Sequence, residues 1–156
     1  MKPVDVIVVG GGAAGMMAAG RAAQRGKRVL LVEKNRRLGQ KLSMTGGGRC
    51  NITNAEYNNR ILLVNYGEAE QFLYSAFSRF AVEQTFSFFA ERGLPLVVEA
   101  RQRAFPKTLK ATDVTKVLVQ YLQDHQVLVR TQVAAQGVLT ENGRVIGIGT
   151  DQGSFK

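Results

Sequence analysis

The segment Val4-Asp5-Val6-Ile7-Val8-Val9-Gly10-Gly11-Gly12-Ala13-Ala14-Gly15 decides the fold of this chain. Its first half is a short, almost continuous run of β-branched residues, which is typical of a parallel strand buried on both faces. Its second half satisfies the pattern G-x-G-x-x-G, and the stretch from Ala13 to Arg25 predicts a helix that ends at Gly26. Because such glycine patterns also occur by chance, this one is informative only through its place between a strand and a helix.

A second strand and an acidic residue complete the predicted unit. Val29-Leu30-Leu31-Val32 is again apolar, and Glu33 follows Gly15 by eighteen residues, at the end of this strand. A strand–helix–strand unit of about thirty residues is the size that a right-handed parallel crossover needs. A glycine-rich turn, a helix and an acidic residue about twenty positions further on form the fingerprint of dinucleotide-binding domains. We therefore predict an α/β, Rossmann-like fold that binds a dinucleotide.

Each residue of the glycine-rich turn has a physical task in this prediction. Gly10 makes the tight turn out of the strand, and Gly12 lets the backbone approach a pyrophosphate because no Cβ intervenes. Gly15 lets the helix pack closely on the sheet. The N–H groups at the start of the helix, at Ala13 and Ala14, are expected to face the phosphates.

Glu33 is predicted to select the dinucleotide. Its carboxylate would accept hydrogen bonds from the adenosine ribose and repel a 2′-phosphate, which favours FAD or NAD over NADP. The alternative is a glycine-rich turn without a ligand, followed by an ordinary surface glutamate.

A second glycine-rich segment runs from Gln40 to Asn54 and contains Thr45-Gly46-Gly47-Gly48-Arg49-Cys50-Asn51. Three consecutive glycines allow successive N–H groups to converge on an anion or to approach a flat ring system. Lys41 and Arg49 are long enough to reach phosphate oxygens, and Asn51 can both donate and accept hydrogen bonds. A flexible loop with a solvated basic face is the alternative interpretation of this segment.

These two segments together resemble the N-terminus of a bacterial flavoprotein family, the HI0933-like (YhiN/BaiN) FAD-dependent oxidoreductases. Thr45 replaces the usual serine of the family motif S-G-G-G-R-C-N-x-T-N. The resemblance covers most of the chain and rests on Val9 to Gly15, Glu33-Lys34-Asn35 with Leu38-Gly39-Gln40-Lys41, Thr45 to Asn54, Arg103-Ala104-Phe105-Pro106 and Lys110-Ala111-Thr112-Asp113-Val114.

The resemblance implies a fold of the glutathione-reductase type, with FAD laid across the parallel sheet and a second domain inserted. It implies FAD as the cofactor, NAD(P)H as a transient co-substrate, and recognition of the adenine ring by the backbone at Val133. No catalytic residue is assigned and no metal site is expected. The predicted cofactor-binding residues are Gly10, Gly12, Ala13, Ala14, Gly15, Glu33, Lys34, Lys41, Thr45, Gly46, Gly47, Gly48, Arg49, Cys50, Asn51 and Val133.

The rest of the chain predicts further helices and strands. Apolar spacings of three and four predict helices over residues 69–92 and 112–124, and Val127 to Val129 is a candidate strand. A hairpin is expected around Glu141-Asn142-Gly143. We interpret residues 1–156 as the N-terminal part of an FAD-binding domain. Its three segments are a βαβ unit with the glycine-rich loop (1–54), a helical insertion (55–110), and a helix and strands that return to the sheet (111–156). Residues 153–156 show no pattern of a final strand or helix that would close the sheet. We therefore expect this chain to be the N-terminal piece of a longer protein.

Composition excludes several classes of protein. Cys50 and His125 are the only cysteine and histidine, so neither an intrachain disulfide nor a usual protein-only zinc site is possible. A structural thiol is favoured for Cys50, because a redox disulfide needs a second cysteine. The stretch from Val4 to Gly20 contains Asp5 and five glycines, which argues against a signal peptide or membrane span. We expect a cytoplasmic protein.

The net charge of +9 has several possible meanings. It is compatible with an anionic ligand, but also with nucleic acid, which we disfavour because no nucleic-acid-binding motif is present. The sequence therefore favours a flavoprotein oxidoreductase that acts on a small-molecule substrate. Its expected partner is the missing C-terminal half of the same protein. Two alternatives stay open: a non-enzymatic dinucleotide-binding fragment, and a basic, RNA-associated flavoprotein.

Overall fold

The computed structural model describes residues 3–156, which divide into two compact units. Unit 1 takes the residues up to Leu42 and those from Leu118 to Lys156, and unit 2 takes Ser43–Val117. Helix α5 (Ala111–Asp124) contributes residues to both units. Within residues 3–156, no helix combines the length and the apolar character that crossing a membrane requires.

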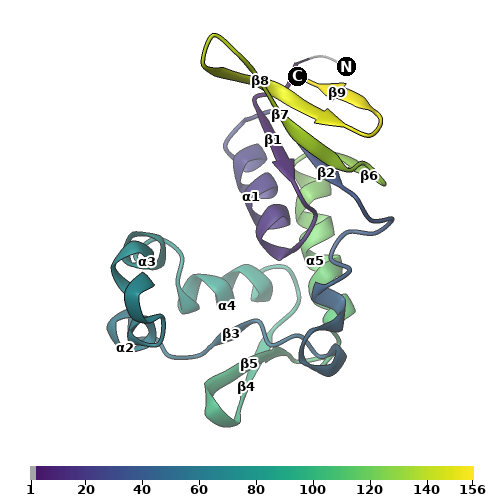
Figure 1. The fold of residues 1–156 in the computed structure, drawn as a ribbon. Helices are drawn as coiled ribbons and strands as arrows, with labels where there is room; N and C mark the ends of the chain where they lie inside the picture. Colours follow the sequence, from purple (N-terminus) through teal and green to yellow (C-terminus); the bar gives the residue numbers. More distant parts are fainter. Residues whose placement is uncertain (1–2) are drawn as a thin grey trace. The chain divides into compact units, whose positions relative to one another are not determined.

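Unit 1 is built on a three-stranded parallel sheet with the strand order β1-β2-β6. These strands are β1 (Val6–Val9), β2 (Val29–Glu33) and β6 (Leu128–Thr131), and helix α1 (Ala13–Gln24) connects the first two (Figure 1). All five residues of β2 are buried, because the middle strand is covered on both faces. The predicted strand–helix–strand unit is confirmed, and Gly26 follows α1 with a φ of +80°.

An antiparallel ribbon of three strands follows β6 along the chain: β7 (Ala135–Glu141), β8 (Arg144–Thr150) and β9 (Gly153–Phe155). The predicted hairpin is confirmed, with Asn142 and Gly143 at φ values of +49° and +73° between β7 and β8. The expectation that residues 153–156 form no strand is wrong, since β9 pairs with β8. A strand of three residues is too short to show the alternation of apolar and polar residues in the sequence. The turn before β9 is closed by the Thr150 hydroxyl, which donates to the carbonyl of Gly153 at 2.7 Å.

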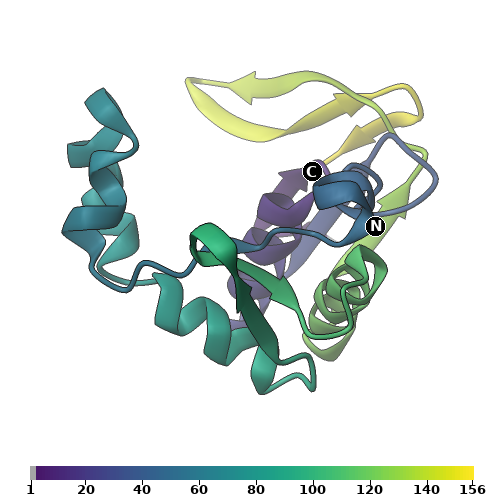
Figure 2. The same ribbon diagram turned by 90° about the horizontal axis from the view of Figure 1, so that it is seen from below.

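The two faces of the parallel sheet are covered by different elements. Leu30 and Val32 of β2 form a buried cluster with Val133 and Ile148, so the antiparallel ribbon covers this face. The ribbon lies to one side of the parallel strands in both Figure 1 and Figure 2. Helix α1 packs against β1 and β2 and meets α5 at Gly20, where an added Cβ would overlap the ring of Tyr121.

Unit 2 combines three complete helices and the first part of α5 with a small antiparallel sheet of strand order β3-β5-β4. The strands are β3 (Thr53–Asn54), β4 (Leu96–Glu99) and β5 (Arg103–Pro106), and the helices are α2 (Asn59–Val64), α3 (Glu70–Phe77) and α4 (Val82–Ala90). Short 3-10 segments lie at Leu42–Gly48, Gly67–Ala69 and Ala100–Gln102. Strands β4 and β5 were not predicted, because neither shows a regular alternation of apolar and polar residues.

The single helix predicted over residues 69–92 is wrong, because the structure has α3 and α4 with a break between them. Ala81 is extended, and its N–H donates to Oε1 of Gln84 at 2.9 Å, which caps a new helix start. The apolar spacing continues across this break in the sequence, and periodicity alone therefore could not locate it.

Candidate dinucleotide-binding site

The carboxyl edge of the parallel sheet holds the first candidate site. Glu33 ends β2 and is only 8% exposed. Its Oε2 accepts the N–H of Gly11 at 2.7 Å, and its Oε1 accepts the N–H and Nδ2 of Asn35 at 2.8 and 2.6 Å. The carboxylate thereby fastens the glycine-rich turn after β1 to the end of β2.

The glycines of this turn serve close packing. Gly10 has a φ of +101°, which confirms the predicted tight turn. A Cβ at Gly15 would overlap the carbonyl oxygen of Gly10, and a Cβ at Gly11 would overlap Leu38. Gly12 differs from these, because it is exposed and nothing lies within 4 Å of the place of its Cβ. The open surface above Gly12 is the space that a ligand needs.

The start of α1 offers unsatisfied backbone donors beside Gly12. The first intrahelical bond runs from the N–H of Met16 to the carbonyl of Gly12 at 2.9 Å, so the N–H groups of Ala13, Ala14 and Gly15 precede the helical ladder. The helix has no side-chain cap and no acidic residue in its first turn. These donors and the positive end of the helix dipole suit a phosphate group.

The electrostatics of Glu33 reflect its partners. Burial raises the pKa of Glu33, but the hydrogen bonds from Asn35 and Gly11 lower it more, and the pKa therefore lies below the ordinary value of a glutamate. The carboxylate is thus ionised at neutral pH. Its two oxygens have about four acceptor sites, and three are used by Gly11 and Asn35. About one acceptor site is left for a ligand hydroxyl.

Val133 lies at the same edge of unit 1. It is 3% exposed, and its N–H donates to the carbonyl of Glu33 at 3.0 Å. Its backbone donor is therefore already bound to β2. Lys34 and Lys41, which were predicted to bind the cofactor, are exposed side chains of the same unit.

The second glycine-rich loop, in unit 2, adopts a left-handed turn. Gly46, Gly47 and Gly48 have φ values of +57°, +64° and +85°, while Thr45 before them is extended. Nothing lies within 4 Å of a Cβ placed at Gly47 or Gly48. These glycines serve the backbone conformation and leave an open surface.

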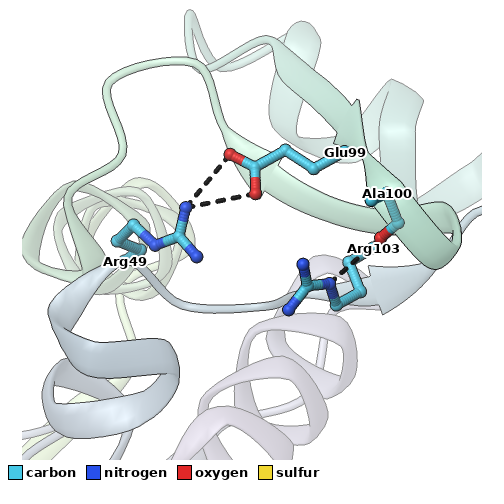
Figure 3. A network of polar contacts seen from close by, with 4 residues as sticks. All are labelled: Arg49, Glu99, Ala100 and Arg103. Carbon is cyan, nitrogen blue, oxygen red and sulfur yellow. Dashed lines mark hydrogen bonds and ion pairs between the residues drawn. The ribbon is translucent and has the colours of Figure 1, made fainter.

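Arg49 makes contacts that the sequence did not predict. Its Nη1 donates to both carboxylate oxygens of Glu99, each at 3.1 Å (Figure 3). Its guanidinium carbon lies 4.4 Å from the ring centroid of Phe105. Sequence reasoning missed Glu99 because fifty residues separate it from Arg49 and no local motif marks it.

Cys50 and Asn51 turn toward the protein. Cys50 is 2% exposed, and burial raises the pKa of its thiol in spite of a hydrogen bond with Thr45. With its amide group facing two carbonyls, Asn51 donates to Thr53 at 3.1 Å and to Ala104 at 3.2 Å. Both residues hold the loop in place. Across residues 3–156, no three His, Cys, Asp or Glu side chains gather in a way that could hold a metal ion.

The parallel sheet, the glycine-rich turn after β1 and the acidic end of β2 define a Rossmann-like α/β domain. The chain belongs to the HI0933-like protein Rossmann domain family, whose model matches residues 4–156. The resemblance seen in the sequence is thereby confirmed.

Three named proteins are similar in sequence to this chain. The chain is 30% identical over 142 residues to a 3-dehydro-bile acid delta(4,6)-reductase of Clostridium scindens, covering 89% of this chain and 34% of that protein. It is 50% identical over 54 residues to a ribosomal RNA dihydrouridine synthase of Escherichia coli, covering 35% of this chain and 14% of that protein. A protein of the same name from Haemophilus influenzae is 35% identical over 88 residues, covering 56% of this chain and 21% of that protein. The chain therefore spans about a third or less of the length of these relatives.

A solved structure supports the fold. The chain superimposes with a TM-score of 0.72 on a 3-ketosteroid-delta4-(5alpha)-dehydrogenase of Rhodococcus jostii, at 19% identity, covering 96% of this chain and 42% of the dehydrogenase. The glutathione-reductase-like arrangement that the sequence predicted, a parallel sheet with helices and antiparallel strands, is confirmed.

Proposed function

We propose that this chain binds the ADP portion of FAD at the carboxyl edge of the unit 1 sheet, as part of a flavin-dependent oxidoreductase. The observation that supports this most directly is the hydrogen bond of 2.7 Å from Gly11 to Glu33, made next to the open helix start at Gly12. This bond holds a phosphate-binding turn and a ribose acceptor side by side.

Each group at this edge suits one part of the nucleotide. The N–H groups of Ala13 and Ala14 suit the pyrophosphate, because they lie at the positive end of α1. The remaining acceptor capacity of Glu33 suits a ribose hydroxyl, and its negative charge repels a 2′-phosphate. The open turn at Gly46–Gly48 of unit 2 is proposed separately as a cofactor-binding segment.

The proposed reaction class is reduction of a carbon–carbon double bond conjugated to a carbonyl group. FAD, when bound, supplies two-electron hydride chemistry. The names of the bile acid reductase and the dihydrouridine synthases both describe the saturation of such a bond. The overall reaction adds a hydride and a proton across the double bond, with a reduced nicotinamide as the electron donor. We place it in the cytoplasm, where this donor is available.

An RNA substrate is the second candidate, although the absence of a nucleic-acid-binding motif disfavoured it in the sequence. Two of the named relatives are ribosomal RNA dihydrouridine synthases, and the net charge of this chain is +9. A basic surface that binds RNA phosphates loses affinity steeply as salt increases. Salt-dependent binding of a uridine-containing RNA hairpin supports this candidate, and a small enone reduced without any RNA binding supports a small-molecule substrate instead.

The cofactor proposal is tested by titrating the purified 156-residue chain with FAD and following the flavin fluorescence. We expect saturable binding in which ADP competes with FAD and FMN does not, because the proposed contacts are to the ADP portion. Competition by FMN alone, or no saturable binding, contradicts the proposal. FAD binding without any reduction by NAD(P)H indicates the non-enzymatic alternative.

A further inference from the structure

The left-handed turn at Gly46–Gly48 depends on contacts outside its own backbone. Within the loop, the N–H of Arg49 reaches the carbonyl of Gly46 only at 3.3 Å, and the N–H of Cys50 reaches the carbonyl of Thr45 at 3.0 Å. Consecutive residues in the left-handed region gain little cooperative hydrogen bonding and are rare outside glycine. The side chains that follow the turn add contacts that help to hold its conformation.

Arg49 is the residue that fastens the end of the turn to the sheet of unit 2. Its guanidinium lies over the ring of Phe105, which is 1% exposed and forms part of β5. Phe105 also lies beneath Gly46, with its Cε1 3.4 Å from the place of a Cβ there. One buried ring thus supports both the first glycine of the turn and the arginine that ends it.

Glu99 fixes the direction of the Arg49 side chain. It ends β4 and pairs with Arg103 of β5 in the antiparallel register. The turn that joins these strands has Arg101 and Gln102 at φ values of +61° and +55°, and Nε of Arg103 donates to the carbonyl of Ala100 at 3.1 Å (Figure 3). A turn held in such an uncommon conformation by surrounding contacts gives the carboxylate of Glu99 a defined position.

We propose that Glu99 is a positioning residue for the glycine-rich loop, acting through Arg49. It holds the guanidinium over Phe105, so that Gly47 and Gly48 keep the open backbone surface that a ligand can approach. Arg49 is then a support of the loop and not a ligand of the phosphates. This inference rests on the proposed binding of FAD.

The two roles of Arg49 predict opposite results for the variant Glu99→Gln, measured by FAD titration. If Arg49 supports the loop, Glu99→Gln removes its partner, and FAD binds about two- to fivefold more weakly, the range expected for a partly exposed ion pair. As a phosphate ligand, Arg49 is released, and FAD binds equally well or more tightly. The second result overturns the inference. Glu91→Gln is the matched control, because the Glu91 carboxylate is 73% exposed and lies 3.9 Å from its arginine.

A double-mutant cycle tests whether Glu99 acts through Arg49. In the background of Arg49→Gln, the further change Glu99→Gln should leave the affinity for FAD unchanged. A full additional loss in that background shows that Glu99 acts on its own and contradicts the proposed pathway. Glu99→Asp, which keeps the charge, should recover part of the affinity that Glu99→Gln loses.

Hydrogen exchange of the cofactor-free chain separates this inference from the proposed function. Amides of residues 45–51 should exchange faster in Glu99→Gln than in the wild type, with no change in Glu91→Gln. If the wild-type chain fails to bind FAD, the proposed function fails, while this exchange result still decides whether Glu99 positions the loop. Unchanged exchange of residues 45–51 overturns the inference whatever the result with FAD.

Discussion

The two glycine-rich segments have similar composition, but their glycines serve different purposes. At Gly11 and Gly15 in the first segment, glycine is required because neighbouring atoms leave no room for a Cβ, whereas Gly10 has a φ of +101° and Gly12 is open. In Gly46–Gly48, glycine is required because the backbone is left-handed, and a Cβ at Gly47 or Gly48 would meet nothing. Glycine content alone therefore does not reveal whether a position is restricted by space or by conformation.

The difference extends to how each segment is held. The first is fastened by the buried Glu33 carboxylate, which accepts from Gly11, and by the carbonyl of Gly11, which accepts from Gly39 at 2.8 Å. The second is held by the backbone bond from Cys50 to Thr45 and by the side chains of Arg49 and Asn51, of which the Arg49 pair is more exposed than Glu33. We expect substitutions in the first segment to cost more stability than those in the second, and the following experiments test this ranking.

The largest loss of stability is expected for Gly15→Ala. The added methyl group would overlap the carbonyl oxygen of Gly10, and because both atoms belong to the backbone, neither a side chain nor a rotamer can move aside. We expect the free energy of unfolding to fall by about 3 kcal/mol, at the upper end for overpacking. Urea denaturation measures this change. A loss below that of Gly47→Ala would reverse the comparison.

Glu33→Ala should cost about 2 kcal/mol, because the partly buried donors of Gly11 and Asn35 lose their acceptor. The contribution of the carboxylate also depends on pH. Since the folded pKa is lowered, the stabilisation is complete above the ordinary glutamate pKa of about 4.3 and is lost as the pH falls through the lower folded value. The stability difference between wild type and Glu33→Gln, measured in urea, should therefore shrink from pH 7 to pH 3. A constant difference contradicts this account of Glu33.

Gly47→Ala should cost about 1 kcal/mol, the penalty of a left-handed conformation for a residue with a Cβ. Because the site is open, the penalty comes from the backbone alone, and Gly47→Asn should cost less, since asparagine tolerates this region. Thermal unfolding of the two variants provides the comparison. Equal losses for alanine and asparagine would show that space, and not conformation, restricts this glycine.

The smallest effect on stability is expected for Glu99→Gln. The ion pair with Arg49 is 39% and 32% exposed at its two side chains, so its contribution to the free energy of unfolding is below about 1 kcal/mol. Urea denaturation at low and high salt should show a small loss that salt reduces further. A loss as large as that of Glu33→Ala would mean that the two loops are held equally strongly.

The parts of the fold that follow from local chemistry were predictable. The β-branched strand, the turn at Gly10 and the acid at Glu33 could be located from the sequence, because strand period, turn geometry and helix start all act over a few residues. The break at Ala81 was missed, since its cap comes from a side chain that periodicity does not register. Glu99 was missed because its partner Arg49 is brought to it only by the β4–β5 pairing.

The central claim is that the open edge at Gly12 receives the pyrophosphate of FAD. Gly12→Ala tests it most directly, because Gly12 has a φ of −79° and nothing within 4 Å of a Cβ, so the variant should fold with little loss of stability. Titration with FAD should then show affinity reduced at least about tenfold, since the methyl group occupies the space above the helix start. Undiminished FAD binding by a folded Gly12→Ala variant would contradict the account.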